Sequence, residues 1–199
     1  MNLANGVAGV ILAAGAASRM GQPKLLLPWK GEALICHAAR TALETGLDPV
    51  VVVTGAGGLE IQAALAGLDV RFVENPDWQA GQSTSVRAGI NALPLSTQAV
   101  IFLLGDQPYV STDLIQALVQ IYAQTHPAIL APYVGEKRTN PVLFDVSVFE
   151  ALRGLRGDAG ARTIFAQYPP TPLPWHDDRL LFDVDTPDDY QRLLRSSSN

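Results

Sequence analysis

The stretch VAGVIL (Val7–Leu12), which runs into AAGAASRMGQPK (Ala13–Lys24), decides the fold. Its first six residues are apolar or small and do not alternate with polar ones. This pattern is typical of a strand that is buried on both faces. Two further runs share it, at Pro49–Val53 and Ala99–Leu104. The three runs predict a mostly parallel central sheet with helices on each side.

Helical patterns fall between these strands and complete the prediction of an α/β fold in three layers. Helices are expected at Leu34–Thr45, Leu59–Leu65, Ser83–Leu93, Leu114–Gln124, Val146–Leu152, Ala159–Gln167 and from Thr186 onward. Further strands are expected at Val70–Glu74, Ile129–Pro132, Val142–Phe144 and Leu180–Val184, and the proline-rich segment Tyr168–Pro174 is expected to be extended or looped. No linker divides the chain, so one domain over residues 1–199 is expected.

The composition excludes several classes of protein. With 199 residues, 48% of them hydrophobic and 17% charged, the chain is not expected to be disordered. Its single cysteine, Cys36, and three scattered histidines (His37, His126 and His176) leave no plausible zinc site or internal disulfide. The net charge of −5 argues against binding along nucleic acid, which needs a basic face.

The uncharged stretch Gly6–Ala17 resembles the core of a signal peptide, but no lysine or arginine precedes Arg19. The stretch is also too short to span a bilayer. We therefore expect a buried strand in a cytoplasmic protein that has no membrane partner.

The loop after the first strand contains small residues and two cations, Arg19 and Lys24. Loop amides and cations of this kind suit a polyphosphate. The spacing of Gly15 and Gly21 fits neither the dinucleotide fingerprint nor the P-loop motif. A surface turn with two solvated charges explains the composition equally well.

Acidic residues follow the Ala99–Leu104 strand and the predicted last strand. Asp106 stands at a strand's carboxyl end, where open α/β sheets bind ligands, and is placed to hold Mg²⁺ against nucleotide phosphates. Asp183 and Asp185 would join it if the last strand adjoins that of Asp106. The alternatives are a turn-forming Asp106 and an Asp185 that only precedes a helix cap.

Two glycine-containing stretches suit anion or base binding. GQSTS (81–85) opens a helix with hydroxyls and amides, although capping by Ser83 alone would explain it. GDAGAR (157–162) places Arg162 near a helix start, within 25 residues of Arg138 in an acidic chain. An anion site and a solvated basic face both fit this pattern.

Taken in order, these pieces resemble one family over about residues 7–194. The motifs are LAAGxxSRMGxxKLLLPW, GQSxSxxxGI, LGDQP, NPVLF, GDxGAR and DxDTPDD. They are similar to those of the molybdenum cofactor cytidylyltransferases, which belong to a broader nucleotidyltransferase group with a Rossmann-like, glycosyltransferase-A type fold. The resemblance implies that CTP and molybdopterin-bound molybdenum give a cytosine dinucleotide cofactor and pyrophosphate. It also implies a nucleotide-binding part over about residues 1–110 and an acceptor-binding part over about 111–194.

The resemblance further implies roles for individual residues. Lys24, Arg19 and Asp106 would be catalytic, and Mg²⁺ or Mn²⁺ would bind to Asp106 with Asp183, the better match, or Asp185. The nucleotide would contact Leu12, Ala13, Ala14, Gly15, Arg19, Lys24, Gln82, Ser83 and Asp106. The acceptor would contact Arg138, Asn140, Asp158 and Arg162. Thr139 departs from the glycine that the family has there.

The motifs leave other functions open. A guanylyltransferase or a sugar-phosphate nucleotidyltransferase would use the same chemistry with another nucleotide or acceptor. A non-catalytic carrier would hand molybdenum cofactor to a molybdenum hydroxylase, a partner that the enzyme would also serve. The pair Asp106 and Asp183 weighs against a pure carrier, which needs no metal carboxylates.

Overall fold

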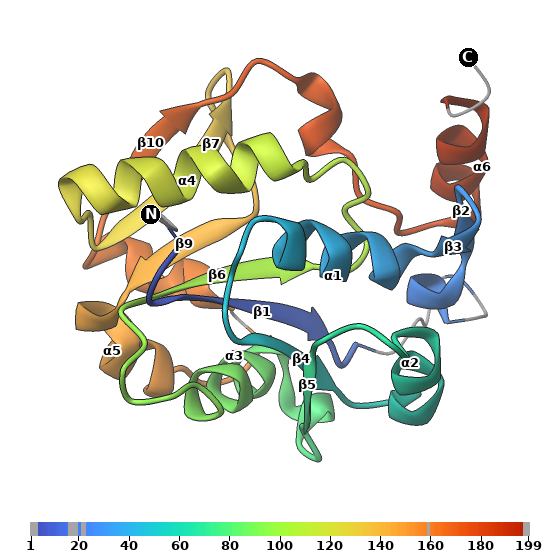
Figure 1. Cartoon of the computed structure of the whole chain (residues 1–199), viewed down its shortest axis with the longest axis horizontal. Coiled ribbons are helices and arrows are strands. Elements are labelled where there is room, and N and C mark those ends of the chain that lie inside the picture. The colour runs from blue at the N-terminus through green and yellow to red at the C-terminus, as the bar shows by residue number, and fades with distance from the viewer. Residues whose placement is uncertain (1–3, 16–19, 21–22, 159, 197–199) are drawn as a thin grey trace.

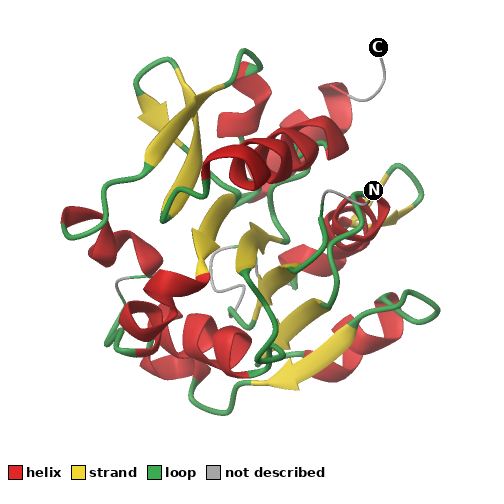
Figure 2. Cartoon of the chain, turned by 60° about the vertical axis from the view of Figure 1, so that its left-hand side comes forward, coloured by secondary structure: helices red, strands yellow, loops and turns green. Residues whose placement is uncertain are grey.

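A central sheet forms the middle layer of the computed structural model, which describes residues 4–15, 20, 23–158 and 160–196 (Figures 1 and 2). The strands are β1 (Val7–Ala13), β4 (Val50–Thr54), β5 (Arg71–Glu74), β6 (Ala99–Leu104), β7 (Ile129–Val134), β8 (Lys137–Arg138), β9 (Val142–Asp145) and β10 (Thr171–Pro174). Their order is β10-β7-β9-β6-β1-β4-β5, with β8 paired to β7.

The predicted parallel core of this sheet is confirmed. β1 lies between β4 and β6 and runs parallel to both, and β5 adds in parallel to β4. β9 is antiparallel to both β6 and β7, so the sheet is mixed on that side. The unbroken apolar runs of β1, β4 and β6 are buried nearly throughout, as strands covered on both faces must be.

Helices cover both faces of the sheet and make the outer layers. Helices α1 (Leu34–Glu44), α2 (Gly58–Ala64) and α4 (Thr112–Thr125) pack on one face, where Ile11 of β1 lies. Helices α3 (Gln82–Asn91) and α5 (Phe149–Arg153) pack on the other face with the 3₁₀ helix η4 (Ala161–Ala166), against Val10. Neighbouring residues of β1 therefore enter different cores, and the three-layer prediction is confirmed.

The prediction of a last strand at Leu180–Val184 is wrong. The chain forms a 3₁₀ helix, η5 (Asp178–Leu181), whose start is capped by Asp177, and then continues without regular structure. The last strand of the sheet in chain order is β10, which lies beside β7 at the edge, in the segment expected to be extended or looped. An edge strand tolerates prolines because its outer amides need no partner. The predicted helix at Ala159–Gln167 is the shorter η4.

A small third cluster joins distant parts of the chain on the right of Figure 1. It lies between the hairpin of β2 (Pro28–Trp29) and β3 (Glu32–Ala33), which follows the 3₁₀ helix η1 (Lys24–Leu26), and the helix α6 (Pro187–Ser196). Its buried side chains are Met20, Leu27, Trp29, Leu34, Val184 and Leu193. The Tyr190 hydroxyl of α6 donates to the Pro28 carbonyl over 2.6 Å. This cluster holds the segment after the first loop against the C-terminal helix.

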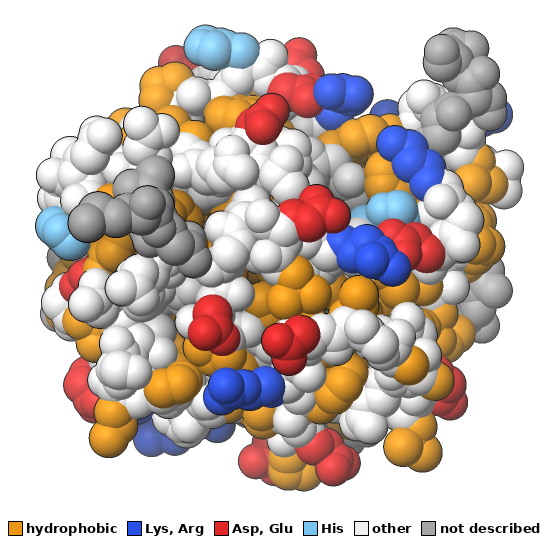
Figure 3. Space-filling view, viewed as in Figure 1, with side chains coloured by type: hydrophobic (Ala, Val, Ile, Leu, Met, Phe, Trp, Pro, Cys, Tyr) orange, Lys and Arg blue, Asp and Glu red, His pale blue; other side chains and the backbone are white. Residues whose placement is uncertain are grey.

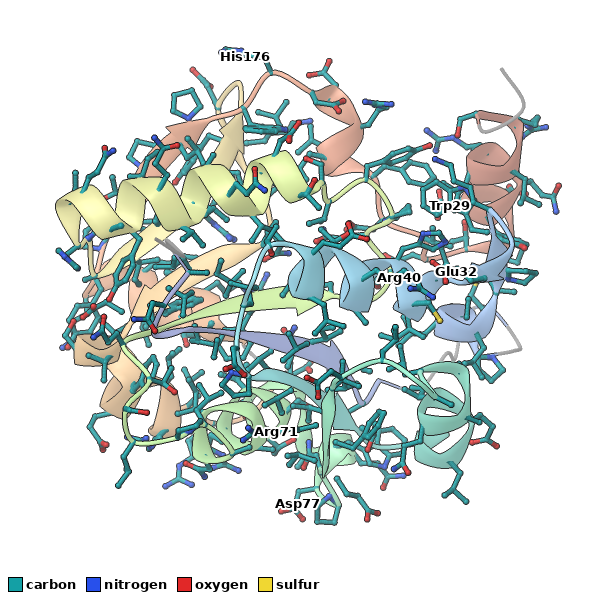
Figure 4. All side chains as sticks on the ribbon, viewed as in Figure 1. Trp29, Glu32, Arg40, Arg71, Asp77 and His176 are labelled. Carbon is teal, nitrogen blue, oxygen red and sulfur yellow. The ribbon has the colours of Figure 1, made fainter. Side chains whose placement is uncertain are left out.

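An ion pair ties the same hairpin to α1. Arg40 of α1 donates through Nε to the Glu32 carboxylate at 2.9 Å, and both residues lie near Trp29 in Figure 4. On the face seen in Figure 3, acidic and basic side chains are interspersed. Among the described residues, no helix has the length and apolarity to cross a bilayer.

Candidate active site

A cleft of about 460 Å³ opens at the carboxyl ends of β1 and β6. These strands are adjacent and parallel, so the loops that follow them meet at one edge of the sheet. The cleft is lined by Leu12, Ala14, Gly15, Lys24, Leu25, Trp78, Gln79, Gly81, Gln82, Ser85, Leu104, Asp106 and Asp158. The structure thus brings both ends of the first loop, at Gly15 and Lys24, to one place with the Asp106 motif and both glycine-containing stretches.

Lys24 lies between two carboxylates in this cleft. Its Nζ is 2.5 Å from Asp106 Oδ2 and 2.7 Å from Asp185 Oδ1. Burial alone would lower the pKa of the Lys24 ammonium, but the two carboxylates outweigh burial and raise the pKa above its ordinary value. Lys24 is therefore charged at neutral pH, beside two acids that lie 82 and 161 residues further along the chain.

Asp183, the better match for the second metal ligand, has a different partner. Its Oδ1 accepts a hydrogen bond of 2.7 Å from Gln107 Nε2. The residue as a whole is exposed, but its carboxylate is buried. Burial first, and then the charges of Asp106 and Asp185, raise the pKa of Asp183. The hydrogen bond from Gln107 opposes this rise but does not cancel it. Asp185, and not Asp183, shares a cation with Asp106.

Backbone contacts place Asp185 without the strand that the sequence predicted. The Val184 amide donates to the Asp106 carbonyl over 3.0 Å, which brings the two acidic segments together. The Asp189 carboxylate accepts from the amides of Asp185 at 3.3 Å and Thr186 at 2.9 Å. The Asp189 amide in turn donates to the Thr186 hydroxyl over 3.2 Å, so the two residues cap the start of α6 reciprocally. The cap of α6 therefore also fixes the acid at the site.

The acids at this position suit a hard divalent cation. Asp106 Oδ1 and Gln107 Oε1 are buried and have no hydrogen-bond partner among the described residues. Two oxygens, from Asp106 and Asp185, already contact one cationic group. Within the described part of the chain, no cluster of three or more acidic, histidine or cysteine side chains has metal-binding geometry, although Asp183 lies close enough to Asp106 and Asp185 for their charges to raise its pKa after burial. Mg²⁺ is commonly held by one or two carboxylates together with substrate phosphates, and this arrangement fits that description.

The two glycine-containing stretches pack directly on each other. Gly81 has φ +109°, and a Cβ there would lie 2.6 Å from the Gly157 carbonyl oxygen and 2.7 Å from the Asp158 backbone. Only glycine fits this close approach. Gly81, and not Ser83, is the N-cap of α3, and it makes no side-chain cap bond. Ser83, expected near the base or ribose, is 1% exposed and lines neither this cleft nor the next.

Asn75 and Trp78 were missed by the sequence analysis. Asn75 is buried, and its Nδ2 donates to the hydroxyls of Thr84 at 2.8 Å and Ser85 at 2.9 Å, which fixes the start of α3. Trp78 packs against the core on the α3 face of the sheet and also lines the first cleft. Asn75 follows β5 directly and Trp78 begins the short 3₁₀ helix η2 (Trp78–Ala80). The sequence of this segment carries no periodic signal, so only the fold reveals the two residues.

A second cleft of about 290 Å³ adjoins the first. Its lining residues are Leu12, Gln82, Val86, Phe102, Leu104, Arg138, Asn140, Val142, Phe144, Gly160, Ala161, Arg162 and Phe165, and three of them (Leu12, Gln82 and Leu104) also line the first cleft. Of the residues expected at the acceptor, Arg138, Asn140 and Arg162 lie here. Asp158 lies in the first cleft instead.

The second cleft has a positive charge that is not balanced locally. Among the described residues, neither Arg138 nor Arg162 forms an ion pair with a carboxylate, whereas Arg153 is paired with Glu150. Burial first, and the charge of Arg162 after it, lower the pKa of Arg138 despite the opposing effect of Tyr133. Arg19, the other cation predicted to bind phosphate, lies outside the described residues.

Comparisons with known sequences agree with this geometry. A model of the MobA-like NTP transferase domain matches residues 9–171. Purine catabolism protein PucB of Bacillus subtilis is 33% identical, over 96% of this chain and 97% of its own. Nicotine blue oxidoreductase of Paenarthrobacter nicotinovorans is 34% identical, over 94% and 96%. Molybdenum cofactor cytidylyltransferase of Escherichia coli is 25% identical, over 91% and 92%. These names differ in activity, so they do not agree on one reaction.

Solved structures agree on the fold. Rv0371c from Mycobacterium tuberculosis matches with a TM-score of 0.85 and 26% identity, over 95% of this chain and 97% of that one. A complex of Rv0371C with manganese has a TM-score of 0.79 and 28% identity, over 96% and 98%. A nucleotidyl transferase from Methanothermobacter thermautotroptrophicus has a TM-score of 0.80 and 25% identity, over 97% and 99%. The Rossmann-like nucleotidyltransferase fold is thereby confirmed, and the chain belongs to the MobA-like NTP transferase family as a nucleotidyltransferase.

Proposed function

We propose that this chain transfers CMP from CTP to the terminal phosphate of molybdopterin-bound molybdenum cofactor. The products are the cytosine dinucleotide cofactor and pyrophosphate. The observation that carries the proposal is the pair of adjoining clefts, one with Lys24 between Asp106 and Asp185 and the other with Arg138 and Arg162. The choice of CTP and of this acceptor rests on the sequence motifs and on the cytidylyltransferase relative.

In this proposal the first cleft binds the nucleotide. The turn after β1, at Ala14 and Gly15, faces the triphosphate with little side-chain bulk. Lys24, which is charged at neutral pH, brings a positive charge to the phosphate chain, as Arg19 is also proposed to do. Asp106 and Asp185 are proposed to hold Mg²⁺ or Mn²⁺, with Asp183 beside them, and the cation supplies neutralisation of phosphate charge when bound.

The second cleft is proposed to bind the acceptor phosphate. A phosphate oxygen of the acceptor forms a bond to the α-phosphorus of CTP, and the bond from that phosphorus to the bridging oxygen breaks, which releases pyrophosphate. Gln82 lines both clefts, so it faces the junction between the two substrates. Arg138, Asn140 and Arg162 orient the acceptor. Thr139 is buried, and its hydroxyl bonds to the Leu180 carbonyl at 3.3 Å, so this departure from the family lies away from the cleft lining.

The decisive experiment compares nucleotides. Pyrophosphate release is measured with CTP, GTP and ATP, each with molybdopterin-bound molybdenum as the acceptor. We expect turnover with CTP to exceed that with the other two by at least about 10-fold. Preference for GTP, or turnover only with a sugar phosphate, would replace this proposal with the corresponding transferase.

Chelation separates the enzyme from a cofactor carrier. With EDTA present, pyrophosphate release is expected to stop while the finished cofactor still binds. Binding of finished cofactor with no pyrophosphate release, even with added Mg²⁺ or Mn²⁺, would identify a carrier. Transfer of cofactor to a molybdenum hydroxylase is compatible with both functions, so that partner is not used as a criterion.

A further inference from the structure

A column of aromatic rings ends at Arg138 in the second cleft. Phe102 of β6 meets Phe144 of β9 edge to face, with ring centroids 5.7 Å apart. Phe144 stacks on Phe165 of η4 at 6.2 Å with an angle of 18° between the planes. The Arg138 guanidinium carbon lies 4.6 Å from the centroid of the Phe165 ring. All four side chains line the second cleft.

The lower part of this column is rigid. Phe102 is 6% exposed and Phe144 is 1% exposed, so both rings are set by the core between β6, β9 and the helices on that face. Phe165 is half-buried and rests on that fixed base. Its ring attracts the guanidinium by a cation–π contact and sets the plane in which the group lies. A planar guanidinium in a set orientation is suited to two parallel hydrogen bonds to phosphate.

The positive charge of Arg138, at the end of the aromatic column, favours the binding of an anion. Arg138 is half-buried, and burial first, then the charge of nearby Arg162, lower its pKa. Within the described residues neither arginine makes an ion pair with an acid. Two like charges held in one cleft are unfavourable until an anion lies between them. A ring, and not a carboxylate, positions Arg138, so its donors stay available for a ligand.

We propose that Phe165 is a positioning residue, which holds Arg138 so that it binds a phosphate monoester together with Arg162. This inference rests on the proposed function only in calling that phosphate the acceptor's. Apart from the identity of the ligand, the inference states that the affinity of this site for an anion depends on the Phe165 ring, which makes no polar contact with the anion.

The test uses arginine labelling in the free protein, with inorganic phosphate as the probe. Phenylglyoxal modification of Arg138 is followed by mass spectrometry at increasing phosphate concentration. We expect phosphate to protect Arg138 in the native chain. In Phe165→Leu we expect the half-protecting concentration to rise about 3- to 10-fold, the range of a partly buried cation–π contact. Phe165→Tyr keeps the ring face and is expected to restore protection to within about 2-fold.

A matched control removes a neighbouring ring. Tyr168 packs against the same core cluster just after η4 and does not line the second cleft. Tyr168→Leu is expected to leave phosphate protection unchanged, so that loss of ring packing is separated from loss of the cation–π contact. Thermal melting of each variant confirms that it is folded under the labelling conditions.

Two results would overturn the inference. One is absence of phosphate protection at Arg138 in the native chain, and the other is equal protection in the native chain and Phe165→Leu. The proposed function fails separately, through absent or redirected nucleotidyl transfer. Protection that depends on Phe165 in a chain without cytidylyl transfer would leave the anion site standing and remove only the identity of its ligand.

Discussion

Replacing Asp106 by asparagine is expected to abolish activity while leaving the fold nearly as stable. The substitution keeps the shape of the side chain and removes one negative charge from the group around Lys24. Lys24 keeps its 2.7 Å contact with Asp185, so the ammonium is not left unpaired. The Asp106 and Lys24 side chains are 17% and 22% exposed, so the pair lost is partly screened by solvent.

The stability change follows from two opposing effects. Loss of the attraction between Asp106 and Lys24 destabilises the folded state. Relief of repulsion among Asp106, Asp183 and Asp185 stabilises it, since the charges of the other two acids help to raise the pKa of Asp183. We expect the two effects to leave the free energy of unfolding within about 1 kcal/mol of the native value. The pKa of Asp183 should fall toward its ordinary value in the variant.

Activity should respond far more strongly than stability. Asp106 is a proposed metal ligand at the phosphate chain, and loss of one such electrostatic contact costs at least about 10²-fold in turnover. Pyrophosphate release with CTP and urea unfolding measure the two effects on the same preparations. Asp69→Asn removes an equal charge from an exposed loop and serves as the control. Turnover above about a tenth of native, or a loss of more than about 2 kcal/mol of stability, would refute the reasoning.

Three further perturbations test other parts of the structure. Gly81→Ala should lower stability by about 1–3 kcal/mol and weaken CTP binding, because φ is +109° and its Cβ would meet the Gly157 carbonyl; native-like melting and binding would contradict this. Tyr122→Phe should cost about 1–3 kcal/mol in urea unfolding, because the hydroxyl donates to Asp145 at 2.6 Å. Burial would raise the pKa of Asp145, but hydrogen bonds from Ser147 and Tyr122 outweigh it and lower the pKa; the resulting stability is present above about pH 4 and lost as the pH falls through the folded pKa. Tyr122→Phe should therefore show a weaker loss of stability in acid, and an unchanged acid profile would count against this pairing. Chelation of divalent metal should stop turnover, with recovery on adding Mn²⁺; full activity in EDTA would exclude the proposed metal role.

The sheet was predictable because its central strands are buried on both faces. Continuous apolar runs such as Val7–Leu12 have one stable environment in an α/β fold, and the structure places them there. Leu180–Val184 has a similar composition but forms η5 and an irregular segment. Its neighbours decide this outcome: the Asp177 cap starts a helical turn, and β10 occupies the edge beside β7. Local composition contains neither fact.

The lining of the candidate cleft was predictable where a residue follows a strand end. Gly15 and Asp106 line the first cleft because the carboxyl ends of β1 and β6 meet. Whether Asp183 or Asp185 joins Asp106 depends on which carboxylate faces Lys24. Lys24 and Asp185 are 161 residues apart, so their contact leaves no pattern in the local sequence. Asn75 has the same property, since its partners lie on α3 and its own loop has no periodic pattern.

The contact between Lys24 and Asp185 also has a consequence for the order of folding. It closes a loop of 161 residues, so the entropy of that closure must be overcome before the contact forms. Contacts of such long range form late, after the sheet and its helices have supplied most of the burial. A nascent chain or a partly folded state can therefore contain folded β1, β4 and β6 before the contact between Lys24 and Asp185 has formed. Occupancy of the proposed metal site would then report completion of folding, and it would distinguish the native state from compact states that have the same helix and strand content.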